Sequence, residues 1–330
     1  MNPKFVARVL AVATIALLGS VAHAQVVKID GSSTVFPITE GIAEDFQKAN
    51  KGIKVTVGVS GTGGGFKKFC RGETDISNAS RPILSAEMAA CRAAGVEYYE
   101  LPVAFDALTV VINPKNTWLK SITVPELKKI WEPAAQGKVL RWNQVNPAWP
   151  DKPMKLFGAG SDSGTFDYFT EAIVGKAKSS RGDFTASEDD NVLVQGVAGD
   201  VDALGYFGYA YYAENANKLK ALPIAMDAGK PAVGPSDEAV EKGTYQPLSR
   251  PIFIYVRASS LEKPEVKKFV EFYMDHGAAM AKEVKYVALP PEVYKANLKH
   301  LKEGKKGTVF GGHNEVGISI KELVNREAKH

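Results

Sequence analysis

Three segments rich in serine, threonine and glycine each follow a short apolar stretch and precede a helical pattern. They span residues 30–34, 60–65 and 158–165, after strands predicted at 26–29, 53–59 and 154–157. Apolar side chains then recur at helical spacing, as at Ile38, Ile42 and Phe46. This repeated unit of strand, polar turn and helix predicts an α/β fold.

Turns of this composition place backbone N–H groups and hydroxyls at the start of a helix, where a small anion is stabilised. A single turn would be explained by ordinary helix capping, because serine, threonine and glycine are common at helix starts and in tight turns. Three such turns at the carboxyl ends of predicted strands favour one shared site, since ligands of α/β sheets collect at that edge.

Length and composition limit the class of protein. The chain has 330 residues, of which 45% are hydrophobic and 24% charged, so it is long enough for two packed domains and is neither a disordered tail nor a small disulfide scaffold. The formal net charge is only +4, with 41 basic and 37 acidic residues. We therefore expect no nucleic-acid partner, which would require clustered basic side chains.

The first 24 residues have the three parts of a secretory signal peptide. Lys4 and Arg8 precede an apolar run at residues 9–18, and small residues end the segment at Ala24. The alternative is a membrane anchor, but the apolar run is too short to span a bilayer. We expect cleavage after Ala24 and a soluble exported protein that begins at Gln25.

Two cysteines, Cys70 and Cys91, lie 21 positions apart. In an oxidising compartment they are expected to form a disulfide between two neighbouring helices. Two separate buried thiols are the alternative, and a metal site is less favoured because no histidine lies near either cysteine in sequence. The histidines of the mature chain lack ligand spacing, so the sequence predicts no metal site and no cofactor.

Two enzyme classes can be weighed against binding. The glycine-rich segment at residues 61–68 fails the phosphate-loop pattern, because Phe66 separates Gly65 from Lys67. Ser163, between Asp162 and Gly164, is similar to the nucleophile of a serine hydrolase, although Thr165 stands where a glycine is expected. A secreted hydrolase using Ser163 stays an alternative, but the sequence offers no obvious base.

Four motifs together resemble one known family. They are Gly-Ser-Ser-Thr-Val-Phe-Pro at 31–37, the turn at 60–65, Asp-Ile-Ser-Asn-Ala-Ser-Arg-Pro at 75–82, and Asp-Ser-Gly-Thr-Phe at 162–166. Their order and spacing are similar to those of the PstS-like solute-binding proteins, the periplasmic phosphate-binding proteins of the high-affinity phosphate ABC transporter. The resemblance covers nearly the whole mature chain.

The resemblance implies two α/β lobes with mixed sheets flanked by helices, two hinge crossings, and phosphate bound in the cleft between the lobes. The first lobe would combine residues 25–105 with 251–330, and the second would comprise residues 106–250. It further implies a monomer in the periplasm that delivers phosphate to an inner-membrane ABC permease, without enzymatic activity.

The site residues implied by the resemblance are those of the four motifs. They are Ser33, Thr34, Val35, Ser60, Thr62, Ser80, Arg81, Ser163, Gly164 and Thr165. Hydroxyl and amide donors suit a dehydrated phosphate, because every oxygen that loses water must be paired again.

Two positions depart from the family pattern. Arg81 stands where many relatives carry an aspartate, and Gly160 stands where they carry an arginine. We hypothesise that Arg81 clamps the anion and is held by Asp162 behind it; a surface pair with Glu87 is the alternative. Without the aspartate that accepts the phosphate proton, another tetrahedral oxyanion such as sulfate, arsenate or molybdate stays open as the ligand.

Overall fold

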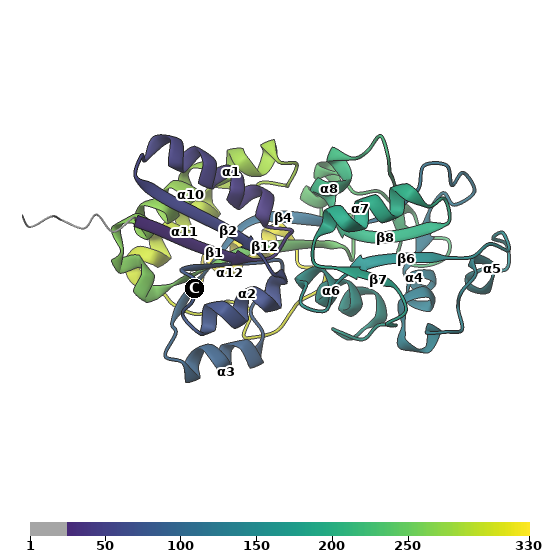
Figure 1. Cartoon of the computed structure of the whole chain (residues 1–330), viewed down its shortest axis with the longest axis horizontal. Helices are drawn as coiled ribbons and strands as arrows, with labels where there is room; N and C mark the ends of the chain where they lie inside the picture. The colour runs from purple at the N-terminus through teal and green to yellow at the C-terminus, as the bar shows by residue number, and fades with distance from the viewer. Residues whose placement is uncertain (1–24) are drawn as a thin grey trace, which may run out of the picture.

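The computed structural model describes residues 25–330 and shows two α/β lobes lying side by side (Figure 1). The predicted signal peptide, residues 1–24, lies outside the described residues. Both lobes consist of a sheet with helices packed against it, which confirms the α/β fold expected from the repeated strand, turn and helix units.

In the sheet of the first lobe, three parallel strands are followed by β12, which runs antiparallel to both of its neighbours, and then by β4. Its strand order is β2 (Ile53–Val59), β1 (Gln25–Gly31), β3 (Ile76–Ala79), β12 (Ser249–Arg257) and β4 (Tyr98–Ile112). The parallel strands end at the same edge, so the turns that follow β1 and β2 lie together.

The sheet of the second lobe continues from β4. Its further strands are β8 (Ala203–Gly208), β6 (Lys155–Ala159), β7 (Thr185–Ser187) and, pairing with β4, β9 (Lys220–Ala221). A small separate sheet contains β11 (Ala232–Val233), β10 (Ile224–Ala225) and β5 (Ile122–Thr123).

Strand β4 joins the two sheets, and every residue of it is buried. Its first part, Tyr98–Ala107, pairs with β12, and its last part, Leu108–Ile112, pairs with β8. Residues 101–112 form a largely apolar run, which predicts a buried strand. The position of β4 explains this run, because a strand that passes through the middle of the molecule is covered on both faces.

Helices cover the sheet of the first lobe. They are α1 (Phe36–Ala49), α2 (Gly61–Cys70), α3 (Ser85–Ala93), α10 (Pro264–Glu283), α11 (Pro291–Glu303) and α12 (Ile320–Glu327), with a 3-10 turn at η3 (Ala258–Glu262). The buried face of α1 carries Ile38, Ile42 and Phe46, as predicted, and the Phe46 ring meets Phe269 of α10 edge to face at 5.3 Å.

The helices of the second lobe are shorter. They are α4 (Val124–Trp131), α5 (Trp142–Val145), α6 (Gly164–Phe169), α7 (Asp190–Gly199), α8 (Tyr209–Glu214) and α9 (Asp237–Glu241), with a 3-10 turn η1 (Pro133–Ala135) and a π-helical turn η2 (Thr170–Val174). The sequence Thr-Val-Pro-Glu at residues 123–126 predicts a capping box at the start of α4. This is confirmed, because the Thr123 hydroxyl accepts from the Glu126 N–H and the Glu126 carboxylate accepts from the Thr123 N–H.

Three details differ from the local sequence patterns, which predict a second helix beginning at Phe66, a helix from Pro264 that ends at Gly277, and a polar tail after Lys302 that is a surface extension or partly mobile. The second turn is itself the start of α2, which begins at Gly61 and not at Phe66, since a Cβ at Gly65 would lie 2.6 Å from the Gly31 Cα and only glycine permits this packing. Helix α10 runs past Gly277 to Glu283. The polar tail after Lys302 is packed and not a mere extension, because Phe310, Ile318 and Leu323 are buried.

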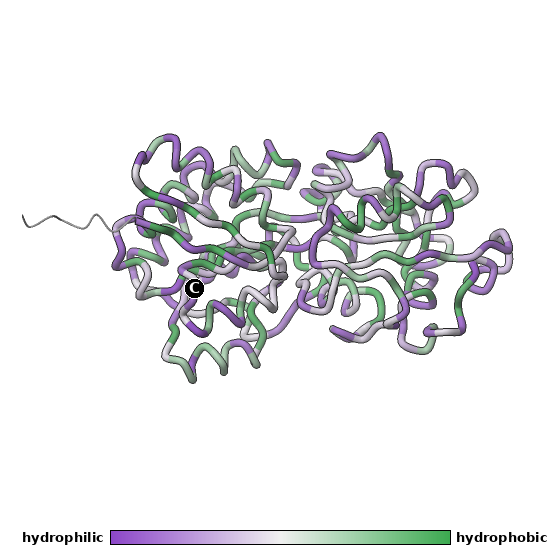
Figure 2. Tube along the Cα trace, viewed as in Figure 1, coloured by the Kyte–Doolittle hydropathy of each residue, from purple (hydrophilic) through white to green (hydrophobic). Residues whose placement is uncertain are grey.

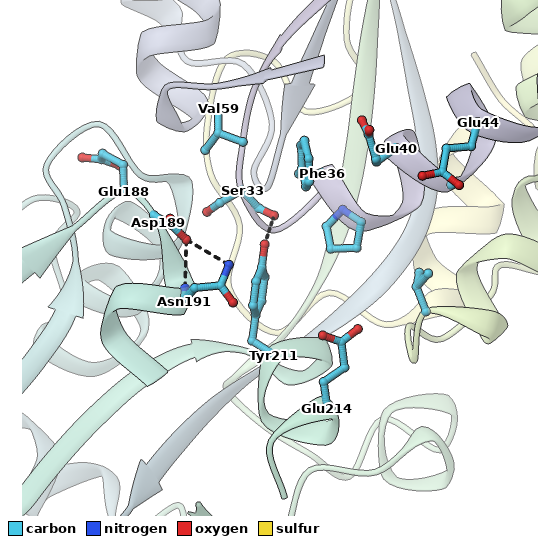
Figure 3. A pocket seen from close by; sticks show the side chains of 13 residues that line it. Ser33, Phe36, Glu40, Glu44, Val59, Glu188, Asp189, Asn191, Tyr211 and Glu214 are labelled. Atoms are coloured by element: carbon cyan, nitrogen blue, oxygen red, sulfur yellow. Dashed lines mark hydrogen bonds between the residues drawn. The ribbon is translucent and has the colours of Figure 1, made fainter. Parts of the chain in front are cut away.

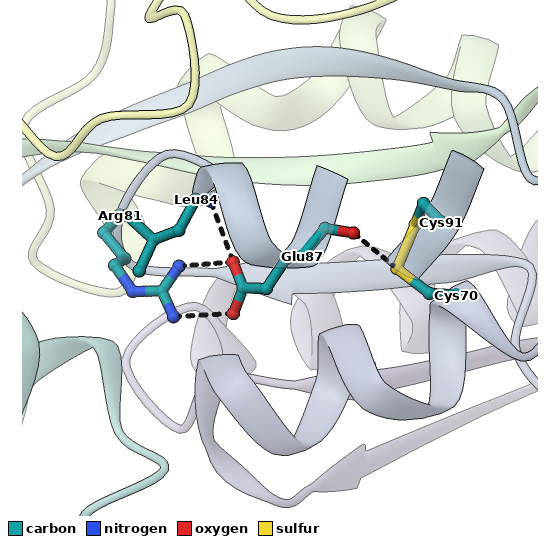
Figure 4. The surroundings of a disulfide bond; sticks show 5 residues. All are labelled: Cys70, Arg81, Leu84, Glu87 and Cys91. Carbon is teal, nitrogen blue, oxygen red and sulfur yellow. Dashed lines mark hydrogen bonds and ion pairs between the residues drawn. A yellow bond between two sulfur atoms is a disulfide. The ribbon is translucent and has the colours of Figure 1, made fainter. Parts of the chain in front are cut away.

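The disulfide between Cys70 and Cys91 is present and joins the end of α2 to α3 (Figure 4). This confirms the predicted bridge between two neighbouring helices.

Hydrophobic and hydrophilic segments alternate along the chain in both lobes, and many loops at the periphery are hydrophilic (Figure 2). Within residues 25–330, no helix combines the length and the apolar character needed to cross a bilayer.

Candidate functional site

Hydroxyls from the serine and threonine turns of both lobes meet in one buried cluster. The Oγ1 of Thr34, after β1, lies 3.0 Å from the Oγ1 of Thr165 at the start of α6. The Oγ1 of Thr62, in the first turn of α2, lies 3.1 Å from the Oγ of Ser80. All four side chains are fully buried. We call these four residues together with Gly164 the turn cluster.

Gly164 closes the turn cluster from the second lobe. A Cβ at this position would lie 2.5 Å from both the Thr62 Oγ1 and the Ser80 Oγ, closer than real Cβ atoms approach. The backbone of α6 therefore rests directly on hydroxyls of the first lobe, which requires a residue without a side chain.

The local sequence explains how these turns form. Gly31 ends β1 with φ of +141°, and a Cβ there would lie 2.2 Å from the Asn78 carbonyl oxygen, so the chain turns tightly beside β3. At the other turn, the Ser163 hydroxyl caps α6 by accepting from the Thr165 N–H at 3.1 Å.

The remaining predicted site residues of these turns border the turn cluster. The Ser33 carbonyl accepts a hydrogen bond from the Tyr211 hydroxyl of the second lobe at 2.9 Å, and the Val35 side chain is fully buried at the start of α1. The Ser60 hydroxyl donates to the Asp30 carboxylate, so it points away from the other hydroxyls. The structure therefore brings four of the predicted hydroxyls together, those of Thr34, Thr62, Ser80 and Thr165, and leaves that of Ser60 outside the turn cluster.

Arg81 is buried and its donors are directed to carboxylates (Figure 4). Its Nε donates to Asp167 of α6 at 2.7 Å, and Nη1 and Nη2 each donate to Glu87 at 2.8 Å. The predicted support from Asp162 is wrong, because both Asp162 carboxylate oxygens bond Lys67 at 3.0 Å. The Glu87 pair does form, in the interior and not at the surface.

The pair of Arg81 with Asp167 spans the two lobes. Burial lowers the pKa of Arg81, but the hydrogen bonds and charges of Glu87 and Asp167 outweigh this effect, so its pKa is raised and the guanidinium stays charged. Burial raises the pKa of Asp167, and Arg81 opposes that shift.

A second buried arginine lies directly on the turn cluster, and sequence reasoning assigned it no role. Arg250 of β12 donates from Nη2 to the Thr165 Oγ1 at 2.7 Å and from Nη1 to the Gly164 carbonyl at 3.0 Å. Its carboxylate partner is Asp106 of β4, at 3.1 Å from Nη2.

A signal for this pair was present in the sequence. Asp106 interrupts an apolar run at residues 101–112 that indicates a buried strand, and Arg250 lies two positions before the apolar run at residues 252–256. A charged side chain is almost never buried without a partner, so each of the two residues indicated that a partner of opposite charge was needed, although not which one.

Two buried carboxyl groups, Asp106 and Asp190, affect the charge around Arg250. Burial raises the pKa of Asp106, and the adjacent guanidinium offsets this only in part. Burial raises the pKa of Asp190, at the start of α7, to about 7, and the charge of Asp106 adds to that shift. Burial beside the turn cluster therefore disfavours negative charge that is not paired.

A cavity of about 630 Å³ opens beside the turn cluster, lined by residues of both lobes (Figure 3). Its ionisable lining residues are all acidic: Glu40, Glu44, Glu188, Asp189 and Glu214. This lining repels anions, so an anion held nearby has to be retained by short-range hydrogen bonds and by a buried cation.

Two lobes that each bring a helix start to a shared, buried cluster of hydroxyls, with a buried arginine beside it, are typical of a solute-binding protein that encloses a small ligand. Residues 19–276 match the family described as the PBP superfamily domain. The chain belongs to the PstS-like solute-binding proteins of this superfamily.

Two curated relatives carry this assignment. The protein SphX of Synechocystis sp. is 54% identical over 305 residues, covering 92% of this chain and 90% of that protein. The phosphate-binding protein PstS of Staphylococcus saprophyticus subsp. saprophyticus is 40% identical over 271 residues, covering 81% of this chain and 82% of that protein.

Solved structures agree with the two-lobe fold. A possible phosphate binding protein from Planctomyces limnophilus matches with a TM-score of 0.63 at 50% identity, over 86% of this chain and 99% of that chain. A putative phosphate ABC transporter substrate-binding protein from Clostridium perfringens, solved with bound phosphate, matches with a TM-score of 0.67 over 81% of this chain and 100% of that chain. Because this second structure is only 24% identical in sequence, the similarity supports the fold alone.

Proposed function

We propose that the protein captures inorganic phosphate between its two lobes and delivers it to the permease of an ABC-type phosphate importer. The observation that carries this proposal is the turn cluster, in which the hydroxyls of Thr34 and Thr165, one from each lobe, lie 3.0 Å apart beside the buried guanidinium of Arg250. Thr62 and Ser80 of the first lobe add a second pair of hydroxyls 3.1 Å apart. A tetrahedral oxyanion needs many donors in fixed positions, and this is what the cluster offers. The names of the relatives, phosphate-binding proteins, support the same ligand.

The residues proposed to hold phosphate are those of the four motifs. They are Ser33, Thr34, Val35, Ser60, Thr62, Ser80, Arg81, Ser163, Gly164 and Thr165. Thr34, Thr62, Ser80 and Thr165 supply hydroxyls, and Gly164 brings the amides at the start of α6 to the ligand. Arg81 adds positive charge at the edge of the site, held by Asp167 and Glu87.

The lobes are proposed to close on the anion about β4 and β12. The first lobe comprises residues 25–105 with 251–330, and the second comprises residues 106–250. Asp106 and Arg250 lie opposite each other at these boundaries, so a rotation there moves the turns after β1 and β2 relative to α6. Phosphate would shift the population to the closed arrangement by binding it more tightly than the open one.

The proposed site of action is the periplasm, after removal of residues 1–24, and the proposed working form is a monomer. Binding needs no covalent step. The Ser163 hydroxyl caps α6, and within residues 25–330 it has no hydrogen bond to a histidine that could serve as a base.

A thermal-shift panel tests the ligand. The chain from Gln25 to His330 is melted with millimolar phosphate, sulfate, arsenate or molybdate, and a ligand that binds only the folded state raises the melting temperature with its concentration. We expect phosphate to raise the melting temperature at the lowest concentration of the series. If sulfate or molybdate raises the melting temperature and phosphate does not, phosphate is not the ligand.

A further inference from the structure

We propose that Arg250 supplies the larger share of the positive charge that meets the bound anion, and that Asp106 acts as a positioning residue that aims its guanidinium. The inference rests on the proposed function, because it assigns a charge to the same site. It differs from the sequence hypothesis, which gave this role to Arg81.

The position of Arg250 is fixed by the register of two strands. Arg250 and Asp106 are direct partners in the antiparallel pair of β12 with β4. Both side chains are fully buried, and Nε and Nη2 of Arg250 lie 3.3 Å and 3.1 Å from the same carboxylate oxygen. The guanidinium carbon lies 5.4 Å from the centre of the Tyr168 ring, which supports it from the second lobe. The guanidinium is thus held in place before any ligand arrives.

The guanidinium contacts the turns of both lobes at once. Nη2 lies 2.7 Å from the Thr165 Oγ1 of the second lobe and 3.5 Å from the Thr34 Oγ1 of the first, and Nη1 lies 3.0 Å from the Gly164 carbonyl. Each terminal nitrogen of an arginine carries two hydrogens, and within residues 25–330 Nη1 of Arg250 uses one. The second is available to an oxyanion at the turn cluster.

The two buried arginines differ in how far their charge is already compensated. Arg81 bonds two carboxylates, those of Asp167 and Glu87, and also the Pro82 carbonyl. Arg250 bonds a single carboxylate, that of Asp106. An anion is therefore attracted more strongly to Arg250, since the two carboxylates around Arg81 would repel it.

The position of Arg250 links its positive charge to the closure of the two lobes. Arg250 is delivered by a strand at the boundary of the lobes, and its contacts with Thr34 and Thr165 exist together only when the two turns meet. An anion that bonds Arg250 and both hydroxyls stabilises the closed arrangement and not the open one. Arg81 contributes in another way, by its direct bond to Asp167 across the lobes.

The test is isothermal titration with phosphate on the chain from Gln25 to His330 and its variants. R250K keeps the charge and loses the planar fork, so we expect at least 30-fold weaker binding. R250Q/D106N removes both charges without leaving one buried and unpaired, and we expect at least 100-fold weaker binding. The control R257K alters an arginine of the same strand that bonds Asp75, far along β12, and should bind within twofold of wild type.

The positioning role of Asp106 is read from a double-mutant cycle. D106N should weaken phosphate binding about tenfold in the wild-type background and less than twofold in the R250Q background, because Asp106 acts through the guanidinium. If Asp106 had only a structural role, D106N would weaken phosphate binding by the same factor in both backgrounds. If R250Q does not fold, as judged by circular dichroism, the cycle is run with R250K.

The proposal is overturned if folded R250K and R250Q/D106N both bind phosphate within threefold of wild type, or if R81K loses more affinity than R250K. If wild type does not bind phosphate but binds another anion of the panel, the proposed function fails alone, and the same variants titrated with that anion decide the role of Arg250. If wild type binds none of the anions, both proposals fall.

Discussion

Gly164 is the residue at which a missing side chain matters most for the site. Gly164→Ala would place a Cβ 2.5 Å from the Thr62 and Ser80 oxygens, which forces α6 away from the first lobe. We expect at least tenfold weaker phosphate binding, measured by titration, with a melting temperature of the ligand-free protein close to that of wild type.

Gly199→Ala is the matched control for this prediction. Gly199 ends α7, and a Cβ there meets no atom within 4 Å, so phosphate affinity should not change. Equal affinities of the two variants would show that the close approach of α6 to the first lobe is not needed for binding.

Glu327 gives the protein a pH-dependent stability. Burial raises the pKa of Glu327 from 4.5 to about 8, and the charge of Glu100 adds to this. A carboxyl whose pKa is raised on folding stabilises the fold below the unfolded value, and this contribution is lost as pH rises through about 8. Glu327→Gln should therefore melt about 2 °C or more above wild type at pH ~8.5 and close to wild type at pH ~4.5, by scanning calorimetry.

The exposed Glu271 of α10 serves as the control, because Glu271→Gln should leave the melting temperature unchanged at both pH values. A variant of Glu327 that melts below wild type at high pH would mean that the carboxyl is ionised and paired in the folded protein.

At this scale the sequence predicted the turns rich in serine and threonine but not the buried charges beside them. Turn composition is local, and the resemblance to the family singled out Thr34, Thr62 and Thr165 within these turns. The bond between Arg250 and Asp106 depends on the pairing of two strands 144 positions apart, and no local pattern contains that register.

At the scale of elements, the disulfide ties α2, which carries Thr62, to α3. The bridge closes a loop with a sequence separation of 21, so its removal frees the unfolded chain and should lower the free energy of unfolding by about 3 kcal/mol. C70S/C91S in denaturant titrations, without ligand, measures this loss. A reducing agent should lower the stability of wild type to the same level and leave the variant unchanged; a wild type insensitive to reduction would contradict the prediction.

Helix starts were the elements least well predicted. The sequence placed the second helix at Phe66 because glycines are poor helix formers, yet α2 begins at Gly61. The glycines are needed where α2 packs on β1, as the 2.6 Å approach at Gly65 shows. Tertiary packing thus overrides local propensity here, whereas the capping box of α4, a purely local device, was predicted correctly.

At the scale of the whole molecule, the bond of Arg81 with Asp167 holds the lobes together. Asp167→Asn keeps the size of the side chain and removes its charge, so the ligand-free protein should favour a more open arrangement, with a larger radius of gyration in small-angle scattering. Saturating phosphate should restore the wild-type radius, with at least threefold weaker affinity.

Asp151→Asn is the control for that measurement, because Asp151 lies on the surface and pairs with Arg141 inside the second lobe. A ligand-free radius of Asp167→Asn equal to that of wild type would show that the bond does not contribute to closure.

The two-lobe architecture could be predicted because the family motifs are spread over the whole mature chain. The cavity with its acidic lining could not, since Glu40 and Glu188 come from separate lobes and face one space only after the lobes are placed. Relative placement depends on long-range contacts, which are not encoded in any single segment.

The position of β12 in the sheet determines which lobe can complete its sheet first while the chain is being synthesised. Strands β3 and β4 are not paired with each other, because β12 lies between them. Every strand of the second lobe has been synthesised before Ser249, whereas the first sheet stays split in two until residues 249–257 arrive. The lobe that starts the chain is therefore the last to complete its core, and until then the two exposed edges are open to wrong pairing.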